Sequence, residues 1–295
     1  IVAKLAIRFR TNHTRVLDTN DHPENARFFP DSRLNIAESC FNAARSATAI
    51  VYQREGGTIQ RITYGELMRM TRQVAAGLRV MGIEPGAPIA IDMPMTAESI
   101  AIYLGIVWAG CSVVSIADSF AAEEIAIRLD LGQAQLIFTQ DVVLRGGKTL
   151  PLYERVVAAN APPAIVLDGR TDHPAVLLRR SDITWSEFLG KEETDAAVCT
   201  SETHINVLFS SGTTGQPKAI PWTHTTPIKC AADGYLHHDI HQGEVVAWPT
   251  NLGWMMGPWL IYASLINRAT IALYYGVPTG ADFLRFVRDA QVNML

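Results

Sequence analysis

The sequence predicts an α/β fold in which helices cover mostly parallel β-sheets. Short apolar runs typical of buried strands alternate with longer segments of helical periodicity, and strand–helix–strand units repeat along the chain. Crossover connections of this kind place consecutive strands in parallel and put helices on the faces of the sheet. The 295 residues are enough for one large domain or two ordinary ones with a substantial buried core.

The start of the chain lacks this regular pattern. Residues 1–30 show no sustained periodicity, so we expect an N-terminal segment that wraps around the rest of the protein. A helix is expected over residues 34–44, with Ser32 as its N-cap, because serine accepts a hydrogen bond from the first turn of a helix.

A regular order of elements follows this helix. Residues 49–52 and 60–63 have strand composition on either side of a glycine turn. Thr63 and Glu66 have the spacing of a capping box, and apolar residues follow at helical intervals, which predicts a helix beginning there. Three further elements are expected: a strand at 89–93, a helix at 123–131 and a strand at 136–139.

The run at residues 100–116 is apolar and approaches the length of a membrane span. We interpret it as two elements, a buried helix over 97–109 and an internal strand over 113–116. Gly110 separates them, because glycine readily adopts the left-handed conformation that ends a helix.

Composition excludes several classes of function. The net charge of −4 argues against a protein that coats nucleic acid, although a few local cations suffice to bind a phosphate. The cysteines form no CxxC pair, so reduced thiols are expected instead of a disulfide framework or a structural zinc site. They are Cys40, Cys111, Cys199 and Cys230.

Histidines are clustered near residue 240. His237 and His241 have helical spacing, but the sequence has no HExxH motif and Gly243 follows closely. We therefore expect a polar turn before a strand at Val245, and we expect no metal-binding residues in this chain.

The strongest functional signal is a loop rich in hydroxyl residues and glycine at residues 210–218. It lies between apolar strands expected at residues 206–209 and 219–223. Its glycines let backbone N–H groups approach an anion, and its hydroxyl groups and lysine can bind phosphate oxygens. The residues expected to bind phosphate are Ser210, Ser211, Gly212, Thr213, Thr214, Gly215, Gln216 and Lys218.

A flexible serine–glycine linker is the alternative interpretation of this loop. The apolar strands on both sides argue against it, as does the presence of Pro217 and Lys218. A Walker A loop is excluded, because residues 147–149 match only the end of that motif and Val142 occupies the position of its first glycine.

The loop resembles the phosphate-binding signature of the adenylate-forming superfamily, which includes acyl-CoA synthetases, luciferases and the adenylation domains of peptide synthetases. Other stretches resemble the family in the same order along the chain, at residues 34–38, 63–67, 94–110 and 248–257. The first and last of these are most similar to the acetyl-CoA-synthetase branch and, within it, to plant peroxisomal acyl-activating enzymes. The resemblance implies that residues 31–295 are an incomplete AMP-binding large domain.

The resemblance also implies the chemistry, which is that of an ATP-dependent acid:CoA ligase using ATP, Mg²⁺ and coenzyme A. The loop would hold the β- and γ-phosphates of ATP with Mg²⁺ nearby, while a carboxylate attacks the α-phosphorus and pyrophosphate leaves. The catalytic residues would be Lys218, Thr213 and Thr214. The resulting acyl-AMP would then form acyl-CoA.

Residues for the acyl group follow from the resemblance as well. Trp254, Met255 and Met256 fall where relatives line the acyl pocket, and ordinary core packing is the alternative for these residue types. Asn251 stands where many relatives of this branch carry aspartate, which leaves open any role that needs a negative charge there.

A short basic stretch is the candidate site for coenzyme A. Arg145 and Lys148, separated by two glycines, resemble the stretch that binds the 3′-phospho-ADP part of CoA in acetyl-CoA synthetases. Two cations on a surface loop can bind a phosphate, and a solvated turn is the alternative of equal weight.

The later motifs of the superfamily are missing from this sequence, including those for adenine and ribose, the hinge and the C-terminal lysine. We therefore expect an N-terminal fragment without the mobile lid domain, inactive by itself and ending inside a strand at residues 292–295. A truncated, non-catalytic nucleotide- or CoA-binding module is the alternative function. The expected partner is a small-molecule carboxylic acid, with no nucleic acid and no transmembrane segment. The expected location is intracellular, either cytoplasmic or peroxisomal.

Overall fold

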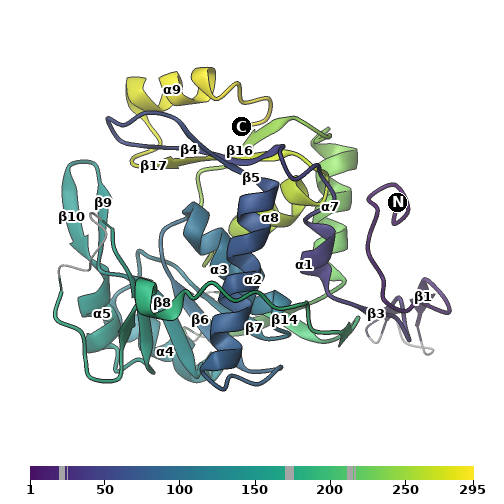
Figure 1. Cartoon of the computed structure of the whole chain (residues 1–295), viewed down its shortest axis with the longest axis horizontal. Helices are drawn as coiled ribbons and strands as arrows, with labels where there is room; N and C mark the ends of the chain where they lie inside the picture. The colour runs from purple at the N-terminus through teal and green to yellow at the C-terminus, as the bar shows by residue number, and fades with distance from the viewer. Residues whose placement is uncertain (20–23, 25, 170–175, 211–214, 216) are drawn as a thin grey trace.

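The computed structural model describes residues 1–19, 24, 26–169, 176–210, 215 and 217–295. Two sheets lie on opposite sides of a central layer of helices, and further helices cover the outer face of each sheet (Figure 1). This arrangement confirms the expected α/β class with helix-covered, mostly parallel sheets.

The large sheet has seven strands in the order β12-β11-β8-β6-β7-β14-β15. All neighbouring strands are parallel except β14 and β15, which are antiparallel. Its strands are β6 (Pro88–Asp92), β7 (Ser112–Ile116), β8 (Leu136–Gln140), β11 (Ala164–Leu167), β12 (Ile183–Thr184), β14 (His204–Ser210) and β15 (Lys218–Thr223).

The small sheet has four strands in the order β16-β17-β4-β5, with β5 antiparallel to β4 and the others parallel. Its strands are β4 (Thr48–Arg54), β5 (Gln60–Thr63), β16 (Val245–Ala247) and β17 (Thr270–Tyr275). Three antiparallel pairs complete the described strands: β1 (Leu17–Asp18) with β2 (Arg27–Phe28), β3 (Arg33–Leu34) with β13 (Cys199–Thr200), and β9 (Val142–Arg145) with β10 (Lys148–Pro151).

Side-chain alternation along the strands explains the layers. In β6, Ile89 and Ile91 join the central core, whereas Ala90 packs on the opposite face.

The helices form a central layer and two outer ones. The central helices are α2 (Tyr64–Val80), α3 (Ala97–Trp108) and α8 (Met256–Leu265). The outer helices are α4 (Ala122–Gly132) and α5 (Leu152–Ala158) on the large sheet and α9 (Gly280–Asp289) on the small sheet. The remaining described helices are α1 (Ile36–Ser39), α6 (Trp185–Phe188) and α7 (Thr226–His237).

The apolar run at residues 100–116 forms a buried helix and a buried strand, as expected. All but one residue of α3 is buried, and β7 is buried along its whole length. Gly110 between them has a φ of +79°, the left-handed conformation that ends the helix. In the part of the chain that the structure describes, each helix is too short or too polar to cross a bilayer.

The capping box at the start of α2 is also confirmed. The Thr63 side chain accepts a hydrogen bond from the backbone N–H of Glu66, and the Glu66 carboxylate accepts one from the backbone N–H of Thr63. These two bonds satisfy donors that the first turn of a helix leaves without partners.

The helix expected at residues 34–44 is wrong in length and in its cap. Only α1 forms, and Asn35 caps it, while Ser32 donates its hydroxyl to the carbonyl of Phe29. A tertiary contact holds the start of the helix, because the Asn35 amide binds carbonyls at the end of α3, whereas a local one follows its end, where the Asn42 amide binds the carbonyl of Ser39. The sequence pattern around this helix does not contain the contact with α3.

The two ends of the chain pack against the rest. In the N-terminal segment, Leu5 is buried in the main core and Arg10 forms an ion pair with Glu38 of α1. The strand expected at residues 292–295 is absent from the described structure, where Met294 forms only an isolated bridge with Val246 of β16.

Candidate functional site

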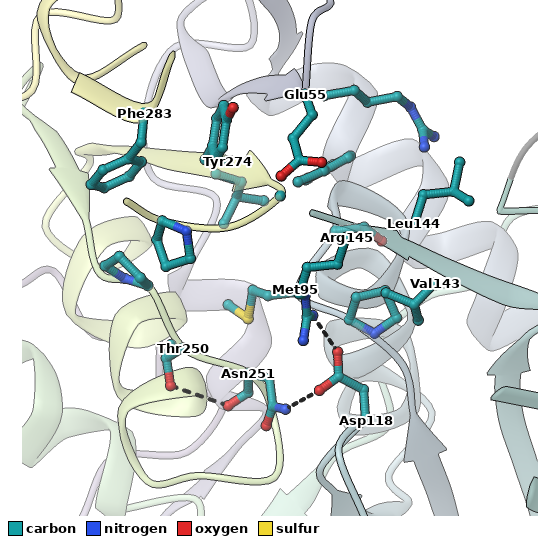
Figure 2. A pocket seen from close by; sticks show the side chains of 18 of the residues that line it. Glu55, Met95, Asp118, Val143, Leu144, Arg145, Thr250, Asn251, Tyr274 and Phe283 are labelled. Carbon is teal, nitrogen blue, oxygen red and sulfur yellow. Dashed lines mark hydrogen bonds and ion pairs between the residues drawn. The ribbon is translucent and has the colours of Figure 1, made fainter. Parts of the chain in front are cut away.

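A cavity of about 780 Å³ opens at the carboxyl ends of parallel strands from both sheets. It lies beyond the ends of β6, β7 and β8 in the large sheet and of β4, β16 and β17 in the small one, and the β9–β10 hairpin forms one side (Figure 2). This edge is the usual position of a ligand site in an α/β fold. Aromatic rings contribute much of the wall: Trp248, Trp254, Tyr274, Tyr275, Phe283 and Phe286.

Five charged residues also line the cavity. Arg54, Arg145 and Lys148 are cations, and Glu55 and Asp118 are anions. Three guanidinium or ammonium groups beside flat aromatic rings suit a ligand that carries both phosphate groups and a ring system. The donor chemistry therefore fits a phosphorylated nucleotide.

Asp118 lies just beyond the end of β7, after Ala117, and is bound by residues from two other segments. Its Oδ2 lies 2.6 Å from Arg145 Nη2, and its Oδ1 lies 2.7 Å from Asn251 Nδ2 (Figure 2). The Asn251 side-chain oxygen in turn accepts a hydrogen bond from the Gly253 backbone N–H at 2.9 Å. The Asp118 side chain is only 2% exposed, whereas that of Arg145 is 36% exposed.

The β9–β10 hairpin carries both predicted CoA-binding cations. Arg145 and Lys148 are cross-strand partners that flank Gly146 and Gly147, and both glycines have positive φ angles, +59° and +70°. The Glu55 carboxylate accepts a hydrogen bond from the Gly146 backbone N–H at 3.0 Å. The hairpin is therefore a tight turn held by a neighbouring strand, and Lys148 is exposed on it.

Glu55 holds a second segment at the same point. Its Oε1 also accepts a hydrogen bond, at 2.7 Å, from the backbone N–H of Val277, which lies between β17 and α9. One carboxylate thus fixes the hairpin turn and the loop that enters α9 against each other, on the rim of the cavity.

The predicted phosphate loop connects two paired strands at the edge of the large sheet. Ser210 ends β14, Lys218 begins β15, and the two residues are cross-strand partners. Gly215 has a φ of +82°, and Lys218 is exposed. Because β14 and β7 are parallel neighbours, Ser210 lies at the same edge of the sheet as Asp118. Five predicted residues lie outside the described part of the chain: Ser211, Gly212, Thr213, Thr214 and Gln216.

The three predicted acyl-pocket residues have different surroundings. Trp254 and Met255 are 53% and 57% exposed, whereas Met256, the first residue of α8, packs against the main core. Trp254 lines the cavity, with its ring centroid 6.0 Å from that of Phe120. Core packing, the alternative interpretation, therefore describes Met256 and not the other two.

Two glycines explain why the loop between β16 and α8, which contains Asn251 and Trp254, lies so close to β7. A Cβ at Gly253 would clash with the backbone of Ala117, which follows β7, and a Cβ at Gly257 would clash with the carbonyl of Asn251. Both positions need glycine for close backbone approach and not for an unusual φ angle. The loop therefore packs against the end of β7, next to Asp118.

Sequence reasoning missed Asp118, Glu55 and Arg54. Asp118 could have been noticed, because it lies just beyond a fully buried strand of a mostly parallel sheet, where functional residues gather. Arg54 ends a strand of the second sheet and Glu55 follows it, and no sequence pattern indicates that this sheet faces the same cavity.

Asp92, at the end of β6, is a second buried carboxyl near Asp118. It is fully buried, and neither of its oxygens has a hydrogen-bond partner among the residues that the structure describes. Burial, reinforced by the negative charge of Asp118, raises the pKa of Asp92 well above its usual value. Burial therefore disfavours the charged form of this carboxyl group in the folded protein.

Known proteins are similar to this chain over most or all of its length. The family model described as "AMP-binding enzyme" matches residues 37–295. Among curated proteins, "Hexanoyl-CoA synthase" from Cannabis sativa is 46% identical over 100% of this chain and 43% of its own length. "Probable acyl-activating enzyme 17, peroxisomal" from Arabidopsis thaliana is 47% identical over 94% of this chain and 40% of its own length.

A solved structure has the same fold. "Acetoacetyl-CoA Synthetase from Streptomyces lividans" superposes with a TM-score of 0.86 and 26% identity, covering 99% of this chain and 49% of that one. The chain thus spans less than half the length of the relatives it matches. Because the family model matches most of its residues, this chain belongs to the family of AMP-binding enzymes.

Proposed function

We propose that this chain is part of an ATP-dependent acid:CoA ligase, which activates a carboxylic acid as acyl-AMP and then forms acyl-CoA. The observation that carries the proposal is the position of the cavity. Three cations and several aromatic rings meet at the carboxyl ends of the strands, at the sheet edge where β14 leads into the loop at residues 210–218. The names of the relatives, which include acyl- and acetyl-CoA synthetases, support the same reaction.

The first half-reaction is proposed to occur beside the loop at residues 210–218. The carboxylate oxygen of the acid attacks the α-phosphorus of ATP, the bond to the β-phosphate breaks, and pyrophosphate leaves. The hydroxyl groups of the loop and Lys218 would neutralise the charge of the departing phosphates. Among the described residues no cluster of metal-ligating side chains is present, and Mg²⁺ would enter with the phosphates of ATP.

The second half-reaction is proposed to use the cavity. The thiol of CoA attacks the acyl carbonyl and AMP leaves, while Arg145 and Lys148 hold the phosphate on the ribose of CoA. Trp254, Met255 and Met256 would bound the acyl chain. The compartment that we propose is cytoplasmic or peroxisomal, and the name of the Arabidopsis relative supports the second.

Acid-dependent exchange between ATP and pyrophosphate in the complete protein tests this proposal. Lys218→Ala should lower the exchange rate by roughly tenfold, because a charge-assisted contact to phosphate contributes about 1.5–3 kcal/mol. The matched control is Lys229→Ala, an exposed lysine of α7 that is paired with Asp233, and it should leave exchange unchanged.

Two outcomes would contradict the proposal. Equal exchange in wild type and Lys218→Ala across a range of ATP concentrations would remove Lys218 from the phosphate site. Absence of exchange with every acid in a broad panel, while ATP or CoA still binds, would favour a non-catalytic nucleotide- or CoA-binding module.

A further inference from the structure

The charged residues of the cavity differ in how they are paired. Among the described residues, Arg145 is the cavity cation that forms an ion pair, and its partner is Asp118. Arg54 and Lys148 form no ion pair with any described residue. A carboxylate this deeply buried beside a predicted phosphate-binding cation either neutralises that cation or holds it in place.

The geometry of the Arg145 side chain distinguishes these two roles. One of its terminal nitrogens is bound by Asp118, and its remaining guanidinium N–H groups make no hydrogen bond to a described residue. A guanidinium has five donors in a fixed fork, so one end can be held while the others face a ligand. Its partial exposure leaves those other donors open to the cavity.

Asp118 also connects two parts of the site that are distant in sequence. Arg145 is 27 positions away from it and Asn251 is 133 positions away, yet each binds one carboxylate oxygen. Asn251 belongs to the loop that carries the predicted acyl-pocket residues, and its own oxygen holds the Gly253 N–H. One carboxylate thus lies between the hairpin and the acyl loop.

We propose that Asp118 is a positioning residue that holds Arg145 ready for the ribose phosphate of CoA and joins the hairpin to the acyl loop. The proposal rests on the proposed ligase function and adds a residue to its second half-reaction. Pre-organisation of this kind increases affinity, because the long arginine side chain loses its freedom on folding and not on binding.

The test replaces Asp118 in the complete protein. In Asp118→Asn the amide oxygen still accepts the hydrogen bond from Asn251. The new NH₂ group is itself a donor, so it cannot accept a hydrogen bond from Arg145, and the guanidinium is no longer held. We expect the KM for CoA in the thioester reaction to rise roughly tenfold, as for the loss of one immobilised side chain. ATP–pyrophosphate exchange serves as the internal reference, and the ratio of the two half-reactions should fall. With dephospho-CoA the variant and the wild type should have the same KM.

Two further variants isolate the effect. In an Arg145→Ala background, Asp118→Asn should cause no additional rise in the KM for CoA, because Asp118 acts through Arg145. The matched control is Asp182→Asn, which removes another buried carboxylate paired with an arginine, Arg179, that does not line the cavity. It should lower the melting temperature without changing the KM for CoA.

The outcomes are separable. If wild type shows no acid-dependent exchange and no thioester formation, the proposed function fails. If wild type is active but Asp118→Asn lowers the KM for CoA, Asp118 neutralises Arg145 and the positioning role is overturned. An unchanged KM overturns it as well, and so does an equal loss in both half-reactions accompanied by a lower melting temperature.

Discussion

Two buried aspartates of this protein each bind an arginine, yet their surroundings differ. Asp182 accepts hydrogen bonds from five donors of Arg179, Tyr153, Ser181 and the Ala164 backbone N–H, and its side chain is fully buried. Asp118 accepts bonds from two side chains and faces a cavity. A carboxylate whose lone pairs are all occupied stabilises the fold, whereas one with few donors at a cavity wall is available for function.

The pKa of Asp182 reflects its full set of partners. Burial by itself raises this pKa, but the hydrogen bonds from Arg179, Tyr153, Ser181 and the Ala164 N–H outweigh burial and lower it below the usual value. Asp92 is the opposite case, because burial without a hydrogen bond from any described residue raises its pKa. The hydrogen bonds that Asp182 accepts and Asp92 lacks among these residues contribute to the opposite directions of the two pKa shifts.

The largest effect on stability is expected for Asp182→Ala. Removing one partner of a buried pair leaves Arg179 and Tyr153 without their acceptor, so unfolding free energy should fall by about 3–5 kcal/mol. Urea denaturation at pH 7 measures this loss. Asp289→Ala, an exposed aspartate of α9 paired with Arg288, is the control and should leave stability nearly unchanged.

The loss should also depend on pH. The folded-state pKa of Asp182 is lowered, so its contribution is complete above the pKa of an unfolded aspartate, about 3.9, and disappears as pH falls through the folded-state pKa. The difference between wild type and variant should therefore shrink below about pH 4. A difference that stays constant down to pH 2 would show that Asp182 acts by packing and not by its charge.

A smaller loss is expected for Asn251→Asp. This change places a second carboxylate against Asp118, where the amide now donates a hydrogen bond at 2.7 Å. Loss of a buried hydrogen bond and repulsion between like charges should cost about 1–3 kcal/mol at pH 8. Because protonation of one carboxyl group removes the repulsion between like charges, the cost should diminish as pH falls toward 4. Equal stability at pH 8 would mean that Asp118 is not held by residue 251 in solution.

A gain in stability, and not a loss, is expected for Asp92→Asn. The folded-state pKa of Asp92 is raised, so wild type loses about 1.4 kcal/mol per pH unit from this group once pH exceeds about 3.9, until the folded-state pKa is reached. The variant lacks this slope. Its advantage in thermal unfolding should therefore grow from pH 5 to pH 7, and a constant difference would indicate that Asp92 is ionised in the folded protein.

Local chemistry explains which features the sequence predicts well. The capping box at Thr63, the left-handed Gly110 and the buried strand expected at residues 89–93 each depend on residues within a few positions of one another. The glycine-rich hairpin at Arg145 and the strands on both sides of the loop at residues 210–218 are local in the same sense. Backbone geometry and side-chain periodicity determine such elements before the chain is packed.

Only the tertiary structure determines the remaining features, because their partners are far apart in sequence. The length of α1 depends on carbonyl groups at the end of α3 that bind Asn35. Asp118 becomes a part of the site because two parallel sheets turn their carboxyl ends toward one cavity, which brings Arg145 and Asn251 to the same carboxylate. In the sequence, Asp118 stands just after a strand and Asp182 just before one, so the two look alike. The number of donors that folding brings to each carboxylate distinguishes the structural one from the positioning one.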